Sequence, residues 1–461
     1  HQNIGFEAID LANGLFRVTN RFYFTNLKKY MVHYSVTANN KVVRSGKVSL
    51  DIEPQASKEF TVPVGNLKPQ AGTEYFVNFN VTTVEKEPLI PIGHEIACDQ
   101  FRLPIESPKK AFKTSGPKLT VSTNGDNLSA SSSKVNFVFN RKTGIVTSYK
   151  VDGTEYFSEG FGIQPNFWRA PTDNDYGNGM PKRLQVWKES SKNFNVTDAT
   201  VTMDGNNAVV NVNYLLPAGN LYIVNYTIYP SGAVNVAARF TSTDMDAAQT
   251  EVSEATRTAT FTPGRDAARK EASKLNVPRI GVRFRLPASM NQVEYFGRGP
   301  AENYLDRNAG SMIGLYKSTA EELYFPYVRP QENGHHTDTR WVSLSTGKKG
   351  LLIQADNTIG FNALRNSIED FDDEEATGLP RQWSNFTPEQ VANHDEAAAK
   401  SVLRRQHHIN DITPRDFVEV CVDLKQQGVA GYDSWGSRPE PAYTLPANRE
   451  YNWGFTLIPL K

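Results

Sequence analysis

Acids and arginines crowd the glycine-rich stretch at residues 295–308, YFGRGPAENYLDRN. Glu302 and Asp306 lie four residues apart, and two such acids could carry acid–base chemistry if their separation and pKa values were suitable. The plainer interpretation is a structural turn, shaped by the glycines and Pro300 and held by arginine–carboxylate pairs. We favour the structural interpretation here, and also for the acids and arginines of PYVRPQENGHHTDTRW at residues 326–341.

Short polar side chains fill another stretch, FWRAPTDNDYG at residues 167–177. Asp173, Asn174 and Asp175 could form hydrogen bonds with a ligand rich in hydroxyl groups, or could cap a following helix. Composition alone favours a loop that only caps the helix.

A tryptophan lies in the loop-like stretch GVAGYDSWGSRPEPAY at residues 428–443. Asp433, Ser434 and Trp435 stand between glycines, where an aromatic side chain is costly to expose unless it binds something. An indole face can stack on the apolar C–H face of a sugar ring. On these residues alone, packing of Trp435 in the core is an equal alternative.

Two pairs of adjacent histidines, His335–His336 and His407–His408, raise the possibility of a metal site. Adjacent residues on a strand point to opposite faces, so one such pair is a poor chelator for a single ion. We therefore expect no metal site built from histidine. A structural Mg²⁺, Ca²⁺ or Na⁺ ion held by loop oxygens stays open.

The composition of the 461 residues argues against several classes of partner. The 50 basic and 50 acidic residues give a formal net charge of zero, and without a basic stripe we expect no nucleic-acid partner. No apolar run approaches the length of a bilayer span, so we expect a soluble protein without a membrane partner. The first residues, HQNIGFEAID, are not typical of a signal peptide and suggest an internal cut, which leaves the compartment unknown. Cys98 and Cys421 are expected to be separate buried thiols.

Alternating apolar and polar residues predict an almost entirely β protein. The clearest alternation runs over residues 75–82, and further strands are expected at 22–27, 30–37 and 42–50. Several short strands at this spacing predict an immunoglobulin-like β-sandwich at residues 1–106.

A stretch rich in proline and lysine, without periodicity, predicts a linker at residues 107–117. Strand patterns then resume over residues 118–461, with hairpin signals at 230–232 and 347–350. Helices are expected only at residues 181–190, 319–323 and 388–400. A β domain of this length without repeats implies a very large sandwich. The chain lacks the roughly 250 residues of alternating strand and helix that a (β/α)₈ barrel needs.

Together, the motifs FWRAPTDNDYG, YFGRGPAENYLDRN and PYVRPQENG…DTRW resemble the C-terminal half of the large β-galactosidases of glycoside hydrolase family 2. The resemblance covers nearly the whole chain. It implies that residues 1–106 form the immunoglobulin-like domain that follows the catalytic barrel. It also implies that residues 118–461 form the terminal small-chain domain, a supersandwich similar to galactose mutarotases and other aldose epimerases.

The same resemblance implies two groups of site residues. In the family, the loop after the DND motif lies at the mouth of the active site and opens or closes, with glycines as hinges. The residues of that loop here are Asp173, Asn174, Asp175, Gly177, Asn178 and Gly179. The tryptophan of DDSW-like motifs reaches into the barrel and contacts the sugar, which implies substrate binding by Trp435 with Asp433 and Ser434. Tyr432 replaces the first aspartate of that pattern.

We therefore expect the chain to be the non-catalytic, C-terminal part of a β-galactosidase, a retaining glycosidase that hydrolyses terminal β-D-galactosides. Family chemistry uses two glutamates on the barrel, about 5 Å apart, and neither can be assigned in this sequence. No catalytic residue is expected in this chain, which should be inactive alone and should complete the galactose pocket of the upstream barrel.

The family also suggests partners and competing functions. We expect a homo-oligomer in the full-length enzyme, a bacterial parent of cytoplasmic or periplasmic location, and no cofactor required by this chain, although the parent family binds Mg²⁺, Na⁺ or Ca²⁺. The alternatives are a stand-alone carbohydrate-binding module and an aldose-epimerase-like protein, which needs a histidine acid and a carboxylate base in one cleft. His335 or His336 with Glu302 are the residues to consider for that role, although nothing in their spacing supports it.

Overall fold

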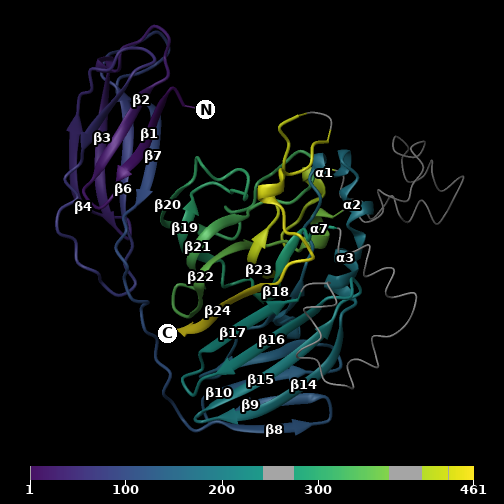
Figure 1. Ribbon diagram of the computed structural model, residues 1–461. Coiled ribbons are helices and arrows are strands. Elements are labelled where there is room, and N and C mark those ends of the chain that lie inside the picture. The colour runs from purple at the N-terminus through teal and green to yellow at the C-terminus, as the bar shows by residue number, and fades with distance from the viewer. Residues whose placement is uncertain (1, 242–274, 373–407, 434–435) are drawn as a thin grey trace, which may run out of the picture. The chain divides into compact units, whose positions relative to one another are not determined.

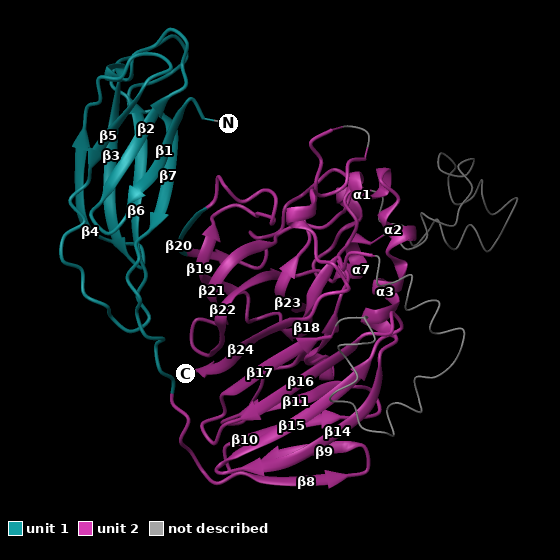
Figure 2. Cartoon of the chain, viewed as in Figure 1, with its two compact units in different colours: residues 1–112, 312–315 teal, residues 113–311, 316–461 magenta. Residues whose placement is uncertain are grey.

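The computed structural model describes residues 2–241, 275–372, 408–433 and 436–461. The chain forms two compact units (Figures 1 and 2), the first from His1–Phe112 with Met312–Leu315, the second from Lys113–Ser311 with Tyr316–Lys461. The division falls inside the stretch expected to be a linker. Residues 312–315, which the sequence pattern placed in the second domain, group with the first unit.

The described residues of the first unit form a β-sandwich of a three-stranded and a four-stranded antiparallel sheet. The strands of the smaller sheet are β1 (Ile4–Asp10), β2 (Leu15–Asn20) and β5 (Ser57–Thr61), and those of the larger are, in order, β4 (Lys41–Val48), β3 (Tyr30–Ala38), β6 (Tyr75–Thr83) and β7 (Glu95–Arg102). Phe79 of β6 meets Phe16 of β2 edge to face at 4.9 Å and stacks on Phe6 of β1 at 4.4 Å between ring centroids. The core therefore lies between the two sheets.

The strand expected at residues 22–27 is wrong. Residues 21–26 are a loop that leads into a short 3₁₀ helix, η1 (Leu27–Lys29), and Tyr23 and Phe24 point into solvent. The buried Asn20 donates its amide hydrogens to the carbonyl oxygens of Thr25 and Ile52 and accepts the N–H of Phe22. Hydrogen bonds from one asparagine replace the ladder that a strand would need.

The second unit packs a smaller sheet against a much larger one. The smaller sheet contains β8 (Thr120–Asn124), β9 (Asn127–Ser131), β10 (Val135–Asn140), β11 (Ile145–Val151) and β12 (Thr154–Glu155). The main path of the larger sheet runs, in order, through β13 (Gln164–Asn166), β18 (Arg279–Pro287), β23 (Phe417–Gln426), β22 (Gly350–Leu364), β24 (Tyr451–Leu460), β17 (Val234–Phe240), β16 (Leu221–Ile228), β15 (Asn207–Leu215) and β14 (Asn195–Asp204). β21 (His336–Ser345) pairs β22 and β19 (Gln292–Gly299), and β19 also pairs β20 (Met312–Thr319).

Aromatic side chains fill the space between these two sheets. Phe137 of β10 lies 5.6 Å from Tyr226 of β16, centroid to centroid, and both rings are buried. Figure 1 shows β8, β9 and β10 as a layer along β14, β15 and β16. The hairpin expected around residues 230–232 is confirmed by the pairing of Ile228 with Val234, and the one around 347–350 by the pairing of Leu344 with Leu351.

Helices are short in the described part of this unit. The α-helices are α1 (Asp173–Gly177), α2 (Met180–Arg183), α3 (Gln185–Lys192) and α7 (Ile368–Phe371), and the 3₁₀ helices are η2 (Ser158–Gly160), η4 (Ile409–Asp411) and η5 (Pro441–Tyr443). The helix expected at 181–190 is divided at Leu184 into α2 and α3, and residues 320–323 form only a turn after β20. The helix expected at 388–400 lies outside the described residues.

Two further sequence expectations concern thiols and membranes. Both cysteines are free, but only Cys421 is buried; Cys98 is partly exposed because it follows the buried Ala97 on β7 and so points to the opposite face of that strand. In the described ranges, no helix is long and apolar enough to cross a bilayer.

Candidate functional site

Helix α1 begins at a reciprocal cap. The hydroxyl oxygen of Thr172 accepts the N–H of Asp175 at 3.2 Å, and the Asp175 carboxylate accepts the N–H of Thr172 at 2.9 Å. This capping box satisfies two backbone donors that a helix start leaves without partners. The DND stretch is therefore one helical turn and not the loop that its composition predicted, because Thr-x-x-Asp is itself a capping signal.

The inner face of α1 is held by a buried ion pair. The two terminal guanidinium nitrogens of Arg169, Nη1 and Nη2, both donate to the Asp175 carboxylate, the second at 3.2 Å, and the two side chains are 0% and 2% exposed. A bidentate arginine–carboxylate pair fixes the orientation of the two side chains as well as their distance. Asp175 was expected in a loop facing the active site, but its carboxylate faces the interior and is occupied by these partners.

The outer face of α1 is joined to the stretch that contains PYVRPQENG. Arg329 donates to the exposed Asp173 carboxylate at 3.2 Å, and its guanidinium lies 3.9 Å from the centroid of the Tyr176 ring. The side-chain oxygen of Gln331 accepts the N–H of Asp173 at 3.0 Å. Two motifs that are far apart in the sequence thus meet at this helix.

The third side of α1 contacts the segment that contains the tryptophan motif. The side-chain amide of Asn174 donates to the carbonyl oxygens of Val429 at 3.2 Å and Ser437 at 2.7 Å. The amide of Asn178 donates to the same Ser437 oxygen at 3.3 Å. The structure therefore brings the expected loop residues together with the expected sugar-binding segment.

Glycines permit a close approach between these two elements. A Cβ atom on Gly436 would stand 2.5 Å from the carbonyl carbon of Gly177, so no side chain fits there. Gly179 has φ +73°, the left-handed region that favours glycine, where the chain turns from α1 into α2. The hinge role expected for Gly177 and Gly179 stays a prediction.

The tryptophan segment, which we define as residues 429–437, is held at its first end by a carboxylate of the YLDRN motif. Asp306 accepts the N–H groups of Val429 at 3.0 Å and Ala430 at 2.7 Å. Asp433 is exposed, and its carboxylate accepts the N–H of Ser437 at 3.2 Å, which is a hydrogen bond within the segment. Ser434 and Trp435 lie outside the described residues. The geometry gives Asp306 the structural role favoured from the sequence.

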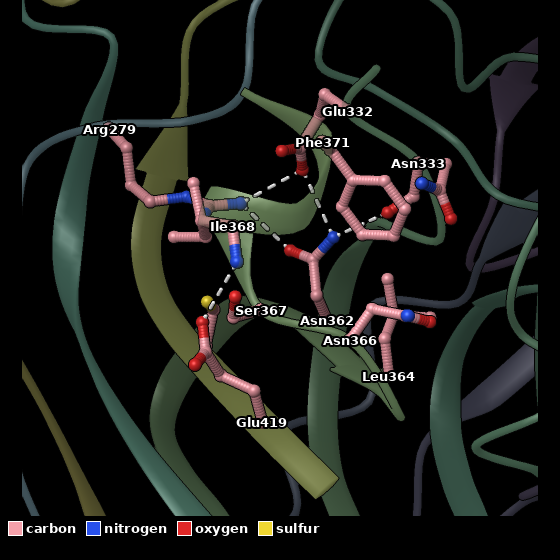
Figure 3. A pocket seen from close by; sticks show the side chains of 11 residues that line it. Arg279, Glu332, Asn333, Asn362, Leu364, Asn366, Ser367, Ile368, Phe371 and Glu419 are labelled. Atoms are coloured by element: carbon pink, nitrogen blue, oxygen red, sulfur yellow. Dashed lines mark hydrogen bonds and ion pairs between the residues drawn. The ribbon is translucent and has the colours of Figure 1, made fainter. Parts of the chain in front are cut away.

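A buried ion cluster lies beneath these loops, formed by Arg279, Glu332, Asn362, Asp423 and Gln426 (Figure 3 shows its first three members). Arg279 donates to Glu332 at 3.0 Å and to Asn362 at 2.8 Å, and its Nε lies 3.2 Å from Asp423. Gln426, the last residue of β23, donates to Glu332 at 2.9 Å. The cluster therefore ties the end of β23, just before the tryptophan segment, to the stretch that contacts Asp173.

Burial dominates the electrostatics of this cluster. Burial raises the pKa of Asp423 to about 7, against the lowering effect of Arg279 and with help from Glu332. Burial also lowers the pKa of the neighbouring His335 to about 3, and the positive charge of Arg279 adds to this. His335 is therefore a neutral imidazole at neutral pH, bonded through Nδ1 to Asn362 at 2.9 Å.

A small cavity opens beside the cluster, lined among others by Arg279, Glu332, Glu419 and Cys421 (Figure 3). Its volume of ≈ 20 Å³ leaves room for about one or two water molecules. A hexose does not fit in this space.

The geometry also disfavours an epimerase site at the residues considered for it. His335 and His336 are each 1% exposed. The Glu302 carboxylate accepts hydrogen bonds from the Tyr327 hydroxyl, from Arg307 at 3.0 Å and from the Gly334 N–H at 2.7 Å. It holds a loop together and does not face an open cleft with an imidazole.

Metal ligation was the other role considered for the histidine pairs. His336 places its ring between the carbonyl oxygens of Gly334 and Pro300, and His407 lies outside the described residues. In the part of the chain that the structure describes, no group of three or more His, Cys, Asp or Glu side chains is arranged to hold a metal ion.

Sequence reasoning missed the buried cations that position the site. Arg169 and Arg279 are each 0% exposed, and neither was singled out. One signal was present: RIGVRFRLP and CVDLK each place charges inside an otherwise apolar strand pattern, which predicts buried partners. Their pairing across β18 and β23 could not be deduced without the sheet order.

Comparison with solved structures returns sugar epimerase-like proteins with low overall similarity. A putative mutarotase from Salmonella typhimurium aligns over 75% of this chain and 94% of its own, with 10% identity and a TM-score of 0.36. The galactose 1-epimerase of Lactobacillus acidophilus NCFM aligns over 75% of this chain and 98% of its own, with 7% identity and a TM-score of 0.34.

Comparison with curated sequences returns β-galactosidases. That of Priestia megaterium is 30% identical over 100% of this chain and 39% of its own length, and that of Streptococcus thermophilus is 24% identical over 96% and 37%. The chain thus spans less than half the length of these relatives and corresponds to their C-terminal part. Residues 16–104 match the family model of β-galactosidase domain 4, and residues 131–457 match that of the β-galactosidase small chain. From this last match, the chain belongs to the β-galactosidase small-chain family.

Proposed function

We propose that this chain is the non-catalytic, C-terminal part of a β-galactosidase and completes one wall of the sugar pocket of a catalytic barrel. The observation that carries the proposal is the joining of α1 to both ends of the tryptophan segment through Asn174, in a chain of this family. This assembly holds the exposed Asp433 through its hydrogen bond with Ser437, and Ser434 and Trp435 follow Asp433 in the sequence.

The acids around this assembly suit positioning better than bond cleavage. Retaining hydrolysis needs two carboxyl groups about 5 Å apart on either side of the glycosidic bond. Asp175 is paired with Arg169, Asp306 binds two backbone N–H groups, and Glu302 binds a tyrosine, an arginine and a backbone N–H. These three acids are already engaged in holding the fold, so we propose that the nucleophile and the acid/base come from the barrel.

The decisive test is turnover of a chromogenic β-galactoside by this chain, by the upstream barrel of the same enzyme, and by both mixed. The proposal expects hydrolysis only in the mixture or in the covalent full-length enzyme. Robust turnover by this chain alone would end it. Failure of both the mixture and the full-length enzyme to turn over the galactoside, while another glycoside is cleaved, would also reject it.

Isothermal titration of this chain with galactose and lactose separates the proposal from a stand-alone carbohydrate-binding module. Half a pocket leaves most of the sugar in water, so we expect no measurable binding at micromolar sugar. Micromolar affinity for either sugar would favour the module. The catalytic barrel would then no longer be needed to explain the sugar contact.

Partners and ions are also proposals. We propose a homo-oligomeric parent enzyme that binds its galactoside jointly through this chain and the barrel, and no cofactor for this chain itself. Light scattering of the full-length enzyme measures its oligomeric state. Denaturation of this chain with and without EDTA, in Mg²⁺, Ca²⁺ or Na⁺ buffers, tests whether it holds an ion, because a bound ion would raise the midpoint.

A further inference from the structure

The polypeptide enters the first unit beside a loop that carries two exposed aromatic side chains. Ile4 at the start of β1 pairs with Asn20 at the end of β2, so the loop at residues 21–26 begins where the chain enters the sandwich. Tyr23 and Phe24 of this loop are exposed, Phe24 to 97%. Two neighbouring rings are costly to leave in water, which favours a partner that covers them.

Side-chain amides hold the backbone of this loop in place. Gln55 donates to the carbonyl oxygens of Arg21 and Phe22, both at 3.0 Å. Asn20 accepts the N–H of Phe22 at 3.0 Å and donates to the carbonyl oxygen of Thr25 at 2.8 Å. The two exposed rings are therefore carried by a backbone that is already ordered, which lowers the entropy cost of docking them on a partner.

A second loop at the same end also carries a costly apolar side chain. Tyr30 at the start of β3 pairs with the last residue of β6, so residues 84–94 lead away from the same end of the sandwich. Glu87 and Ile90 exchange two backbone hydrogen bonds of 3.1 Å around a tight turn. Leu89 in this turn is fully exposed and has φ +66°, the left-handed region that favours glycine or asparagine. A leucine there is both strained and solvated, and a partner that buries its side chain would offset both costs.

The two loops form one surface. Lys29 of η1, which follows the first loop, joins the second through an ion pair with Glu87 at 2.7 Å. Aromatic side chains contribute most of the binding energy at many protein interfaces, and exposed apolar patches mark such sites. We call this surface the entry face and define it by the exposed large apolar side chains of the two loops, Tyr23, Phe24, Val84, Leu89 and Ile92.

The position of the entry face along the chain favours one partner. In the curated relatives, most of the length lies outside the C-terminal part that this chain matches. Gln2 is fixed to β7, because its side chain donates to the carbonyl oxygen of Cys98 at 2.9 Å and accepts the N–H of Cys98 at 2.6 Å. A domain joined ahead of Gln2 is thus tethered near the entry face, where covalent linkage keeps its local concentration high. We propose that the entry face docks on the part of the parent enzyme that precedes this chain, the barrel of the proposed function, on which this inference rests.

Hydroxyl-radical footprinting measures whether the entry face is covered and needs no activity. The oxidation rates of Tyr23, Phe24 and Leu89 are compared between this chain alone and the full-length enzyme. The control is Val42, an exposed residue of β4 that pairs with Thr37 near the other end of β3. Because the core of an interface excludes water, the three rates should fall roughly fivefold or more in the full-length enzyme, and that of Val42 should not. Equal rates in both samples, or an equal fall at Val42, would overturn the proposal. Protection of this chain alone that grows with its concentration would assign the face to a second copy instead.

A photo-crosslinker at the centre of the face identifies what covers it. Phe24→p-benzoylphenylalanine is placed in the full-length enzyme, which is irradiated, digested and analysed by mass spectrometry. Crosslinks to peptides that precede this chain, in a product that keeps the mass of one subunit on a denaturing gel, are the expected result. Crosslinks to residues 113–461, or a product with the mass of two subunits, would reject the barrel as the partner.

Leu89→Asn separates docking from a structural role of the turn. Asparagine tolerates a positive φ, so this chain alone should keep its melting temperature or gain slightly. The full-length enzyme should instead lose roughly 2–4 °C, because an apolar contact with the barrel is removed. The control Val42→Ser should act alike in both samples. An equal shift for Leu89→Asn in both samples would count against docking.

Turnover stays a separate measurement. A full-length enzyme that hydrolyses no galactoside would reject the proposed function. The footprint and the crosslink would still decide whether the preceding part of the enzyme covers the entry face.

Discussion

Two arginine–aspartate pairs hold the same five-residue helix from opposite faces. Arg169 and Asp175 on the inner face are 0% and 2% exposed, whereas Arg329 and Asp173 on the outer face are 38% and 61% exposed. Both pairs include a contact at 3.2 Å. The inner pair is bidentate and the outer pair is joined through one nitrogen, so the two pairs differ in geometry as well as in burial.

Burial changes what each pair contributes. Removal of one partner of a buried pair leaves a charge without compensation in a medium of low dielectric constant. An exposed pair gains little, because water and salt already solvate both charges. The inner pair is therefore expected to fix the position of α1, and the outer pair to adjust it. The partly buried carboxylate of Asp306, which binds two backbone N–H groups, should contribute an amount of stability between those of the two pairs.

The largest effect is expected for Arg169→Leu. The variant leaves the Asp175 carboxylate buried beside an apolar side chain, which should lower the free energy of unfolding by about 3–5 kcal/mol. Denaturant titration followed by tryptophan fluorescence measures this. All six tryptophans lie after residue 112, so the signal reports on the second unit alone.

Arg141→Leu is the matched control for that experiment. Arg141 pairs with Asp126 at 3.5 Å in the same unit, but the two side chains are 45% and 50% exposed. A loss in Arg169→Leu no greater than in Arg141→Leu would break the comparison, since burial would then make no difference.

Asp306→Ala should have the next largest effect. The carboxylate is partly buried and accepts two backbone N–H groups of the tryptophan segment, so its loss should cost about 1.5–3 kcal/mol. Asp306→Asn keeps one acceptor oxygen and should recover part of this. Equal stability of the Ala and Asn variants would show that the two bonds to Val429 and Ala430 are not what Asp306 supplies.

Much of the fold follows from local patterns, as the hairpins show. Val234 to Phe240 alternate between buried and half-buried residues, and this strand pairs with β16 across a Pro-Ser-Gly turn. Period-2 alternation on both sides of a turn is sufficient to define the two strands and their pairing. No strand forms at residues 22–27, because the side chain of Asn20 makes hydrogen bonds with the backbone groups of Phe22 and Thr25. A pattern of strand propensities contains no information about hydrogen bonds of this kind between a side chain and the backbone.

The site was predictable in its residues but not in its contacts. The motifs singled out Asp173, Asn174 and Asp175 as one group, yet the three side chains face three different partners. Asp175 turns inward because Arg169 lies beneath it, and Asn174 meets Val429 because β23 ends beside α1. These partners come together only when the large sheet forms, so a single sequence cannot assign them.

Acidification offers a smaller test on the buried side. The pKa of His335 is about 3 in the folded chain and about 6.5 in the unfolded one, so between these values the unfolded chain binds more protons. His335 thus contributes stability that is present above pH 6.5 and lost as the pH falls, on the order of 1 kcal/mol per pH unit.

Asp423 has the opposite sign in an overlapping window. Its pKa is about 7 when folded and 3.8 ordinarily, so the folded chain takes up the proton first and gains stability as the pH falls from 7 towards 4. His335→Gln should therefore make the second unit relatively more stable at pH 5 than at pH 7, and Asp423→Asn should do the reverse. The control, His94→Gln, changes an exposed imidazole of the first unit. Identical pH slopes in all three variants would reject the assignment of charge states to the buried cluster.

The smallest effect is expected for Arg329→Ala on the outer face of α1. The variant removes an exposed ion pair and a cation–π contact with Tyr176, together worth roughly 0.5–1.5 kcal/mol, and added salt should reduce the ionic part of that difference. Arg329→Met keeps much of the apolar contact with the ring, so the difference between Met and Ala separates packing from charge. A loss as large as that of Arg169→Leu would mean that an exposed pair can fix a helix as firmly as a buried one. The comparison of the two faces would then fail at its premise, since the exposure of an ion pair would no longer predict how much it contributes to the free energy of unfolding.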